Sequence, residues 1–215
     1  YMPESMCAID NTKQIAYEKF SREELGLPID GFVFTCFNRI EKINRKEFNI
    51  WMRLLKKVDK SVLWLVRPNE VAIKNLYSEL DKQGLDKKRI IFAERMNIND
   101  HLSRHLFADL FLDTFNYNAG TTGSLSLWAG LPIITKMGRT YSSRLVARLL
   151  NACDLKELIT YNENEYEELA YELATNKQRL DNIRERLKDK ESSYFDPYKY
   201  TNELENIYTD INLNA

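Results

Sequence analysis

The sequence predicts a single α/β domain of the Rossmann type, a doubly wound parallel sheet with further helices at its C-terminal end. The chain has 215 residues, of which 44% are hydrophobic, and this is enough for one sizeable core. Short apolar runs without polar alternation recur along it, which is typical of parallel strands that helices cover on both faces. Longer amphipathic stretches separate these runs, so that strand and helix alternate five or six times. This alternation predicts right-handed crossovers in a doubly wound sheet.

The expected elements follow in chain order. The apolar runs that predict strands are 32–34, 62–66, 90–92, 110–112 and 132–135. Between the first three runs, residues 45–58 and 69–83 predict helices, because their apolar residues recur at steps of three and four. Residues 124–130 predict a helix after a loop that contains glycine and threonine. From Glu163 onward the helical spacing replaces the strands, among many charged residues.

Three segments are expected along the chain. Residues 1–20 have mixed character and are expected to wrap the domain, and residues 21–192 form the Rossmann-like domain itself. The sequence Ser193-Tyr194-Phe195-Asp196-Pro197 breaks the helical pattern. Residues 193–215 therefore predict a helical tail, whose last helix starts at Tyr200. This helix carries an apolar stripe that is expected to pack against another surface. The stripe consists of Leu204, Ile207, Tyr208 and Ile211.

Composition and charge exclude several classes of protein. The 31 lysines and arginines balance 32 acidic residues, so the formal net charge of −1 leaves no basic field for general nucleic-acid binding. No apolar run approaches the length of a membrane span and the start lacks the features of a signal peptide, so a cytoplasmic protein without membrane contact is expected. Cys7, Cys36 and Cys153 are odd in number and ungrouped, which predicts reduced thiols and no cysteine metal site. The first residue is Tyr1 instead of methionine, which suggests an excerpt of a longer protein.

The loop after the fourth apolar run is a candidate binding site, because ligands of open α/β sheets bind outside the carboxyl ends of the strands. It runs from Thr114 to Gly123, and Gly120, Thr121 and Thr122 open the following helix. Glycine lets a ligand approach the backbone, and free N–H groups with the helix dipole attract an anion such as a phosphate. Alternatively, Thr121 merely caps the helix and the glycines merely turn the chain. The segment alone leaves both interpretations open.

Two cations follow the first strand at the same edge of the expected sheet. Arg39 and Lys42 stand in the sequence Asn38-Arg39-Ile40-Glu41-Lys42-Ile43. Lys42 could neutralise a phosphate there. The alternative is a solvated lysine beside Glu41, which is the commoner situation for a lysine near a protein surface.

Both histidines lie close together in the chain. His101, His105 and Asp109 are four residues apart and could share a helix face as metal ligands. The glutamate of HExxH is missing, Asp109 is expected to belong to the next strand, and no other histidine exists, so a metal site is disfavoured. No Ser/His/Asp set can be assembled either. We expect His101 to close one wall of a nucleotide pocket, with Arg104 directed towards the sheet edge.

Several motifs, in the same order along the chain, carry a resemblance to a known family. They are Phe32 to Asn38 with Lys42 and Ile43, Arg89 to Phe92, His101 to Arg104, Ala108 to Thr114, Tyr117 to Ala119, Thr121 to Gly123 and Leu127 to Pro132. Thr140, Ser143 and Arg144 continue the match. Over nearly its whole length the chain resembles the C-terminal catalytic half of the O-linked N-acetylglucosamine transferase family.

The resemblance implies one half of a two-domain GT-B glycosyltransferase that is inverting and independent of metal. Such an enzyme moves N-acetylglucosamine or a related sugar from a UDP-sugar to serine or threonine of an acceptor protein or peptide. The UDP-sugar is then a co-substrate, and no cofactor is expected. Residues 21–192 would hold the nucleotide sugar. The general base, the N-terminal half from which residues 1–20 would lead, and helical repeats would lie outside this chain.

The resemblance also implies roles for single residues. Lys42 would bind the pyrophosphate, His101 would lie against the uracil ring, and Arg104 would support that wall. Thr121 and Thr122 would bind phosphate. The donor-binding residues expected in all are Arg39, Lys42, His101, Arg104, Gly120, Thr121, Thr122 and Arg144.

Four positions depart from the pattern of the family. Arg39 stands where relatives often have glutamine or asparagine, although it could still reach phosphate. Gly120 stands where relatives usually have histidine, and Leu125 stands where an acidic residue usually holds the ribose hydroxyls. Ile98 replaces a lysine that some relatives place beside the base. Two other hypotheses therefore stay open: a degenerate GT-B half that acts as a protein-interaction module, and a GT-B enzyme with a different nucleotide-sugar donor.

Overall fold

Six parallel strands form one sheet in the order β3-β2-β1-β4-β5-β6 in the computed structural model, which describes residues 10–13, 15–16, 19–188 and 195–213. The strands are β1 (Val33–Cys36), β2 (Val62–Val66), β3 (Ile90–Ala93), β4 (Leu110–Leu112), β5 (Ile133–Lys136) and β6 (Ile159–Thr160). The chain moves outward from β1 to β3, returns past β1 to β4, and continues outward to β6. The expected doubly wound parallel sheet of Rossmann type is confirmed.

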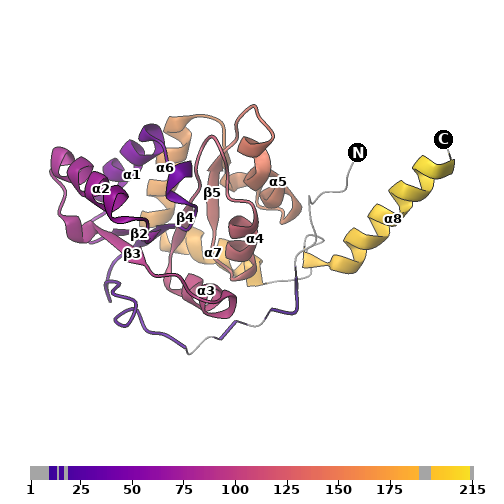
Figure 1. Cartoon of the computed structure of the whole chain (residues 1–215), viewed down its shortest axis with the longest axis horizontal. Coiled ribbons are helices and arrows are strands. Elements are labelled where there is room, and N and C mark those ends of the chain that lie inside the picture. The colour runs from indigo at the N-terminus through magenta and orange to yellow at the C-terminus, as the bar shows by residue number, and fades with distance from the viewer. Residues whose placement is uncertain (1–9, 14, 17–18, 189–194, 214–215) are drawn as a thin grey trace.

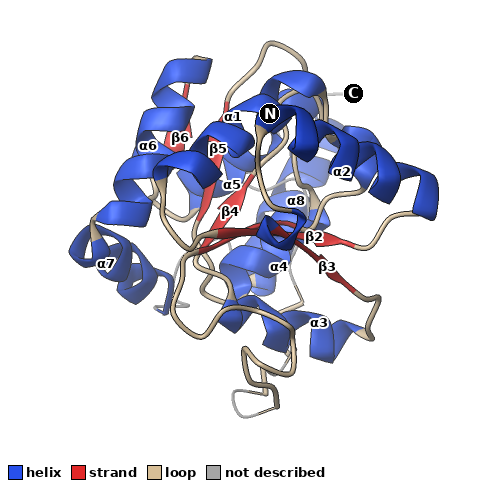
Figure 2. Ribbon diagram, turned by 90° about the vertical axis from the view of Figure 1, so that its left-hand side faces the viewer, coloured by secondary structure: helices blue, strands red, loops and turns tan. Residues whose placement is uncertain are grey.

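Helices cover both faces of the sheet. They are α1 (Arg45–Lys57), α2 (Glu70–Gln83), α3 (Ile98–Arg104), α4 (Thr121–Trp128), α5 (Leu145–Ala152), α6 (Glu163–Thr175), α7 (Lys177–Lys188) and α8 (Pro197–Leu213). Figure 2 shows α1 and α2 on one side of β2 and β3, with α3 and α4 on the other. The largest side chains of the core, among them Trp51, Trp64 and Tyr166, are almost completely buried.

The ends of α1 and α2 explain why both lie within a residue or so of the predicted ranges. Asn44 caps α1, and the Glu47 side chain accepts the Asn44 N–H at 3.1 Å, which completes a capping box. Asn69 caps α2 by accepting the Ala72 N–H at 2.9 Å. Gly84 ends that helix at a φ of 68°, which favours glycine.

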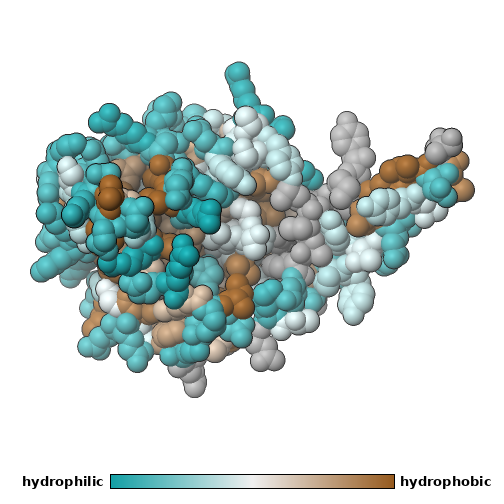
Figure 3. Space-filling model, in the orientation of Figure 1, coloured by the Kyte–Doolittle hydropathy of each residue, from teal (hydrophilic) through white to brown (hydrophobic). Residues whose placement is uncertain are grey.

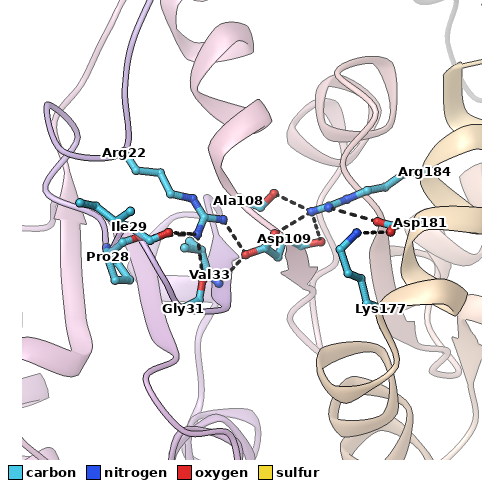
Figure 4. Close-up of polar contacts among 10 residues, drawn as sticks. All are labelled: Arg22, Pro28, Ile29, Gly31, Val33, Ala108, Asp109, Lys177, Asp181 and Arg184. Atoms are coloured by element: carbon cyan, nitrogen blue, oxygen red, sulfur yellow. Dashed lines mark hydrogen bonds and ion pairs between the residues drawn. The ribbon is translucent and has the colours of Figure 1, made fainter.

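At the amino ends of β1 and β4, a partly buried ionic cluster joins the outer segments to the sheet (Figure 4). The Asp109 carboxylate accepts hydrogen bonds from the Val33 N–H and from Arg22, each at 2.8 Å. Its other oxygen accepts from Arg184 of α7, also at 2.8 Å. The cluster therefore ties the segment before β1, the start of β4 and α7 together at the edge of the sheet away from the strands' carboxyl ends.

The described part of residues 10–20 runs along α3 and α4. The Ala16 N–H donates to the Ser103 hydroxyl and the Trp128 indole donates to the Lys13 carbonyl, each at 3.1 Å. The division of the chain at residues 20 and 192 stays a prediction. Cys7, Ser193 and Tyr194 lie outside the described residues.

The last helix, α8, projects away from the sheet (Figure 1). None of its residues is buried, and its apolar side chains form a brown strip in Figure 3. Of the predicted stripe, Tyr208 and Ile211 are more than 60% exposed, and Leu204 and Ile207 are only partly buried, so much of the stripe is open to solvent. Among the described helices, none combines the length and apolar character needed to cross a membrane.

Candidate functional site

The strand order reverses between β1 and β4, and open α/β sheets bind ligands at the carboxyl ends of such a pair. Here the loop after β1 and the loop after β4 are joined by hydrogen bonds. The Asn38 side-chain amide donates to the Thr114 hydroxyl at 2.8 Å. Lys42, in the 3₁₀ turn Ile40–Lys42, donates from Nζ to the Asn118 carbonyl at 3.0 Å. The two loops that carried the predicted cations, glycines and threonines therefore form one site.

The loop after β4 is held by hydrogen bonds of its own. The Thr114 hydroxyl donates to the Tyr117 carbonyl at 2.6 Å, and the Asn118 side chain donates to the Thr114 carbonyl at 2.7 Å. The Ala119 N–H donates to the buried Asp113 carboxylate at 2.7 Å. These bonds fix the residues that precede Gly120.

The loop delivers the N-terminus of α4, which no side chain of the described residues caps. Gly120 is the N-cap and Thr121 the first helical residue, so the alternative in which Thr121 caps the helix is wrong. The Thr121 side chain is exposed and that of Thr122 is half-buried. Uncapped N–H groups and the positive end of the helix dipole suit an anion, and the two hydroxyls can add donors.

Lys42 is half-buried and faces the loop, instead of being a solvated lysine. Its Nζ lies 3.9 Å from the centre of the Tyr117 ring. Burial lowers the pKa of Lys42, and the nearby charge of Asp113 acts against this change. No carboxylate of the described residues forms an ion pair with Lys42, so its positive charge is available to an anionic ligand.

Arg39 is exposed beside Lys42 and lines a groove of about 440 Å³. Arg67, after β2, and Arg95, after β3, line the same groove. Arg67 is paired with Glu70 at 2.7 Å. The sequence reasoning missed Arg67 and Arg95, although both follow predicted strands.

One wall of the site is built from aromatic and cationic side chains. The rings of Phe37 and His101 meet with 5.4 Å between their centres, and the Arg104 guanidinium lies 4.5 Å from the Phe37 ring. Arg104 is buried and donates to the Glu94 carbonyl at 2.6 Å, which places it behind the wall. Burial, followed by the charge of Arg104, lowers the pKa of His101 to about 4, so its ring is neutral at pH 7. A neutral, partly exposed ring can stack against a base.

His101, His105 and Asp109 do not converge on a metal. Helix α3 ends at Arg104, so no common helix face extends to Asp109, which faces two arginines instead. His105 is buried, and its Nδ1 lies 2.5 Å from the His101 carbonyl. Within the described ranges, no group of three histidine, cysteine or acidic side chains is arranged to hold a metal ion.

The loop after β5 packs against the loop after β4. The Asn118 N–H donates to the Ser142 carbonyl at 2.9 Å, and the Ser142 hydroxyl donates to the Asn116 carbonyl at 3.1 Å. This contact brings Arg144, exposed at the start of α5, to the same edge of the sheet. Leu125, where relatives usually have an acidic residue, is only 7% exposed and belongs to the core.

Asp113 is the main residue that the sequence reasoning missed. It directly follows β4, is fully buried, and accepts hydrogen bonds from three elements around the site. Burial raises its pKa to about 7. Its position at the carboxyl end of a predicted strand was the available signal.

The chain is similar in sequence to known proteins over most of its length. The chain is 34% identical over 193 residues to the "Probable UDP-N-acetylglucosamine--peptide N-acetylglucosaminyltransferase SEC" of Arabidopsis thaliana, covering 88% of this chain and 20% of the relative. It is 32% identical to the "UDP-N-acetylglucosamine--peptide N-acetylglucosaminyltransferase" of Caenorhabditis elegans, covering 87% of this chain and 16% of the relative. The chain therefore spans no more than a fifth of the length of either relative.

Solved structures show the same similarity. A mutant of the Thermobaculum terrenum O-GlcNAc transferase matches with a TM-score of 0.78 at 30% identity, covering 84% of this chain and 36% of that one. Anabaena HepE, solved with UDP and glucose, shares the fold with a TM-score of 0.65 at 16% identity, covering 88% of this chain and 51% of that one. The expected half of a GT-B fold is thus confirmed. A sequence model described as glycosyl transferase family 41 matches residues 4–204, and the chain therefore belongs to that family.

Proposed function

We propose that this chain is the donor-binding half of a protein O-glycosyltransferase. It binds a UDP-sugar, and the sugar that the enzyme transfers is N-acetylglucosamine or a related sugar. The acceptor is serine or threonine of a protein or peptide. The observation that carries the proposal is the uncapped start of α4 beside Lys42, at the reversal point of the sheet, in a member of family 41. The names of the relatives from Arabidopsis thaliana and Caenorhabditis elegans support the donor and the acceptor.

Each part of the nucleotide has a partner in this proposal. Lys42, the first N–H groups of α4 and the hydroxyls of Thr121 and Thr122 bind the diphosphate. Arg39 and Arg144 add positive charge at the rim. The neutral His101 ring lies against the uracil, and Arg104 supports it from behind. Gly120 lets the diphosphate approach the backbone.

The same groups support chemistry without a metal. In an inverting transfer the acceptor oxygen attacks the anomeric carbon from the face opposite the diphosphate. The bond from that carbon to the phosphate oxygen breaks, and its electron pair stays on the leaving UDP. Lys42 and the dipole of α4 stabilise this charge, which is the part a metal ion would otherwise play. The acceptor proton passes to a general base that we place outside this chain.

An N-terminal GT-B half and helical repeats complete the enzyme. The small share of its relatives that the chain covers supports this, as does the exposed apolar side of α8. We expect α8 to pack on the other half. A cytoplasmic location agrees with the buried, reduced thiol of Cys36.

The departure at Gly120 favours a second candidate, a GT-B half that keeps the fold as a protein-interaction module, whereas Leu125 belongs to the core and gives that candidate no support. A third candidate is a transferase or epimerase with another nucleotide-sugar donor. UDP binding separates the first two, and a panel of nucleotide-sugar donors tested on the full-length protein separates the first from the third.

Calorimetry of the 215-residue chain with UDP, in the presence and absence of EDTA, tests the proposal. We expect the same saturable binding in both solutions and weaker binding of GDP and ADP. Loss of binding with EDTA would contradict the independence from metal. The absence of UDP binding at high protein concentration would favour the interaction module.

A further inference from the structure

Asp113 connects three elements beneath the proposed donor site. Its Oδ1 accepts the Ala119 N–H at 2.7 Å and the Asn38 side-chain amide at 3.3 Å. Its Oδ2 accepts the Thr135 hydroxyl of β5 at 2.7 Å. The three donors come from the loop after β4, the loop after β1 and the neighbouring strand, and Asp113 itself has no exposed surface. The residue therefore acts on any ligand through these partners and not by contact.

The bond to Ala119 determines where α4 begins. Ala119 directly precedes Gly120, the N-cap, so the position of its N–H sets the position of the free N–H groups that follow. Asn118, one residue earlier, accepts from Lys42. One carboxylate thus fixes both the first turn of α4 and the carbonyl that orients the nearest cation.

The charged and titratable groups around Asp113 come from every element packed against it. They are Cys36 of β1, Lys42 after β1, Glu47 of α1, Lys136 of β5 and Tyr166 of α6. Burial raises the pKa of Cys36, Glu47 and Tyr166, which favours their neutral forms, and Lys136 acts on Glu47. The charge of Asp113 acts to raise the pKa of Lys42, against the larger effect of burial, which lowers it. Burial raises the pKa of Asp113 to about 7, so its charge changes near neutral pH.

We propose that Asp113 is a positioning residue of the donor site, whose ionised carboxylate holds the loop from Thr114 to Gly120 in the arrangement that binds diphosphate. This rests on the proposed function. Protonation replaces the three charge-assisted hydrogen bonds of the carboxylate by neutral ones, which are about half as strong. Protonation also removes a negative charge near Lys42. That loss alone would favour an anion, so the proposal requires the loosened loop to outweigh it. The domain therefore binds its donor nucleotide more tightly above neutral pH than below it.

Titration of the 215-residue chain with UDP-N-acetylglucosamine from pH 6 to 8.5 tests the proposal. This probe is chosen because both its phosphates are diesterified and do not titrate in this range. For the wild type we expect the Kd to rise about fivefold as the pH falls through 7. A factor of about five corresponds to the free-energy difference between one charge-assisted hydrogen bond and a neutral one. The Asp113→Asn variant keeps an oxygen for the Ala119 N–H without the charge. It should show the weak affinity at every pH.

Asp109→Asn is the matched control. Asp109 directly precedes β4, whereas Asp113 directly follows it, and the partners of Asp109 lie at the opposite edge of the sheet (Figure 4). It should keep the pH profile of the wild type. A flat profile in the wild type would overturn the proposal, as would an unchanged profile in Asp113→Asn.

A second measurement covers the case in which nucleotide binding is absent or Asp113→Asn does not fold. In the ligand-free wild type, the Ala119 amide should titrate in NMR spectra with a midpoint near pH 7. The protection factors of the amides from Gly120 to Gly123, corrected for the intrinsic exchange rate at each pH, should be lower below that midpoint. An Ala119 amide that does not titrate would overturn the role of Asp113. A titrating amide together with no nucleotide binding at any pH would instead overturn the proposed function.

Discussion

The ammonium group of Lys42 donates to the backbone carbonyl of Asn118, with 3.0 Å between nitrogen and oxygen. The acceptor is a neutral carbonyl and the neighbouring Tyr117 ring is also uncharged. The half-buried cation is therefore oriented by the loop without being neutralised through direct contact with an anion. A diphosphate that reaches the start of α4 meets this charge already in place.

Substitution of this lysine tests the phosphate contact. Lys42→Ala should weaken the binding of UDP by about 10- to 100-fold, because a charged hydrogen bond contributes roughly 1.5–3 kcal/mol. The affinity for uridine should change much less, since the contact is with phosphate. Lys46→Ala, which removes an exposed lysine 3.3 Å from Glu163, is the control and should change neither. Equal losses for UDP and uridine in titration calorimetry would mean that Lys42 supports the fold instead.

Two glycines at the site should respond differently to a methyl group. A Cβ on Gly138 would lie 2.3 Å from the Ser143 hydroxyl and 2.6 Å from its Cβ, so the turn before Arg144 must shift. A Cβ on Gly120 would meet nothing within 4 Å. Gly138→Ala should lower the free energy of unfolding by about 1–3 kcal/mol, whereas Gly120→Ala should change it by less than about 0.5 kcal/mol. Urea unfolding measures both, and equal effects would contradict this account of the loop.

Leu125 stands where relatives usually hold the ribose hydroxyls with an acidic residue, but in this chain the position is buried in the core. Leu125→Asp should lower the free energy of unfolding by more than about 3 kcal/mol, because it removes core packing and buries a carboxylate. Thr121→Asp places the same residue on the exposed first turn of α4 and should be tolerated. Thermal unfolding compares the two. A folded Leu125→Asp with tighter UDP binding would show that this position faces the ligand.

The ionisation of Asp113 should also appear in the stability of the protein. Its pKa is raised from 3.8 to about 7, so the folded state binds the proton more tightly and loses stability as the pH rises between these values. The stability of Asp113→Asn relative to the wild type should therefore increase by about 2–4 kcal/mol between pH 4 and pH 8. His101, with its pKa lowered to about 4, acts in the opposite direction, but it is present in both proteins and cancels. Denaturant unfolding at both pH values measures the difference in unfolding free energy between the two proteins. The same difference at pH 4 and pH 8 would contradict a raised pKa of the buried Asp113 carboxylate.

The elements that could be predicted from sequence are those whose pattern is local. Continuous apolar runs predicted five of the strands, and the helical spacing of apolar residues predicted α1 and α2. The strand β6 was missed because its two residues, Ile159 and Thr160, form no apolar run. The start of α4 was predicted, since glycine and threonine mark a helix start in the sequence alone.

The contacts that only the assembled fold creates could not be predicted. Arginine is seldom fully buried, and Arg104 is buried here because the Phe37 and Trp64 rings receive its guanidinium. The orientation of Lys42 depends on a loop 76 residues further along the chain. The network of Asp113 likewise needs β1, β4 and β5 to be neighbours, which a single strand pattern does not reveal.

The most direct test of the central claim locates the nucleotide on the labelled protein by NMR. UDP is added to the 215-residue chain in the presence of EDTA, and the backbone amides are followed. The account predicts the largest shifts at Gly120 to Gly123 and around Lys42 and His101, with Arg22, Asp109 and Arg184 at the opposite edge unchanged. Shifts centred on that opposite edge, or no shifts at saturating UDP, would contradict it.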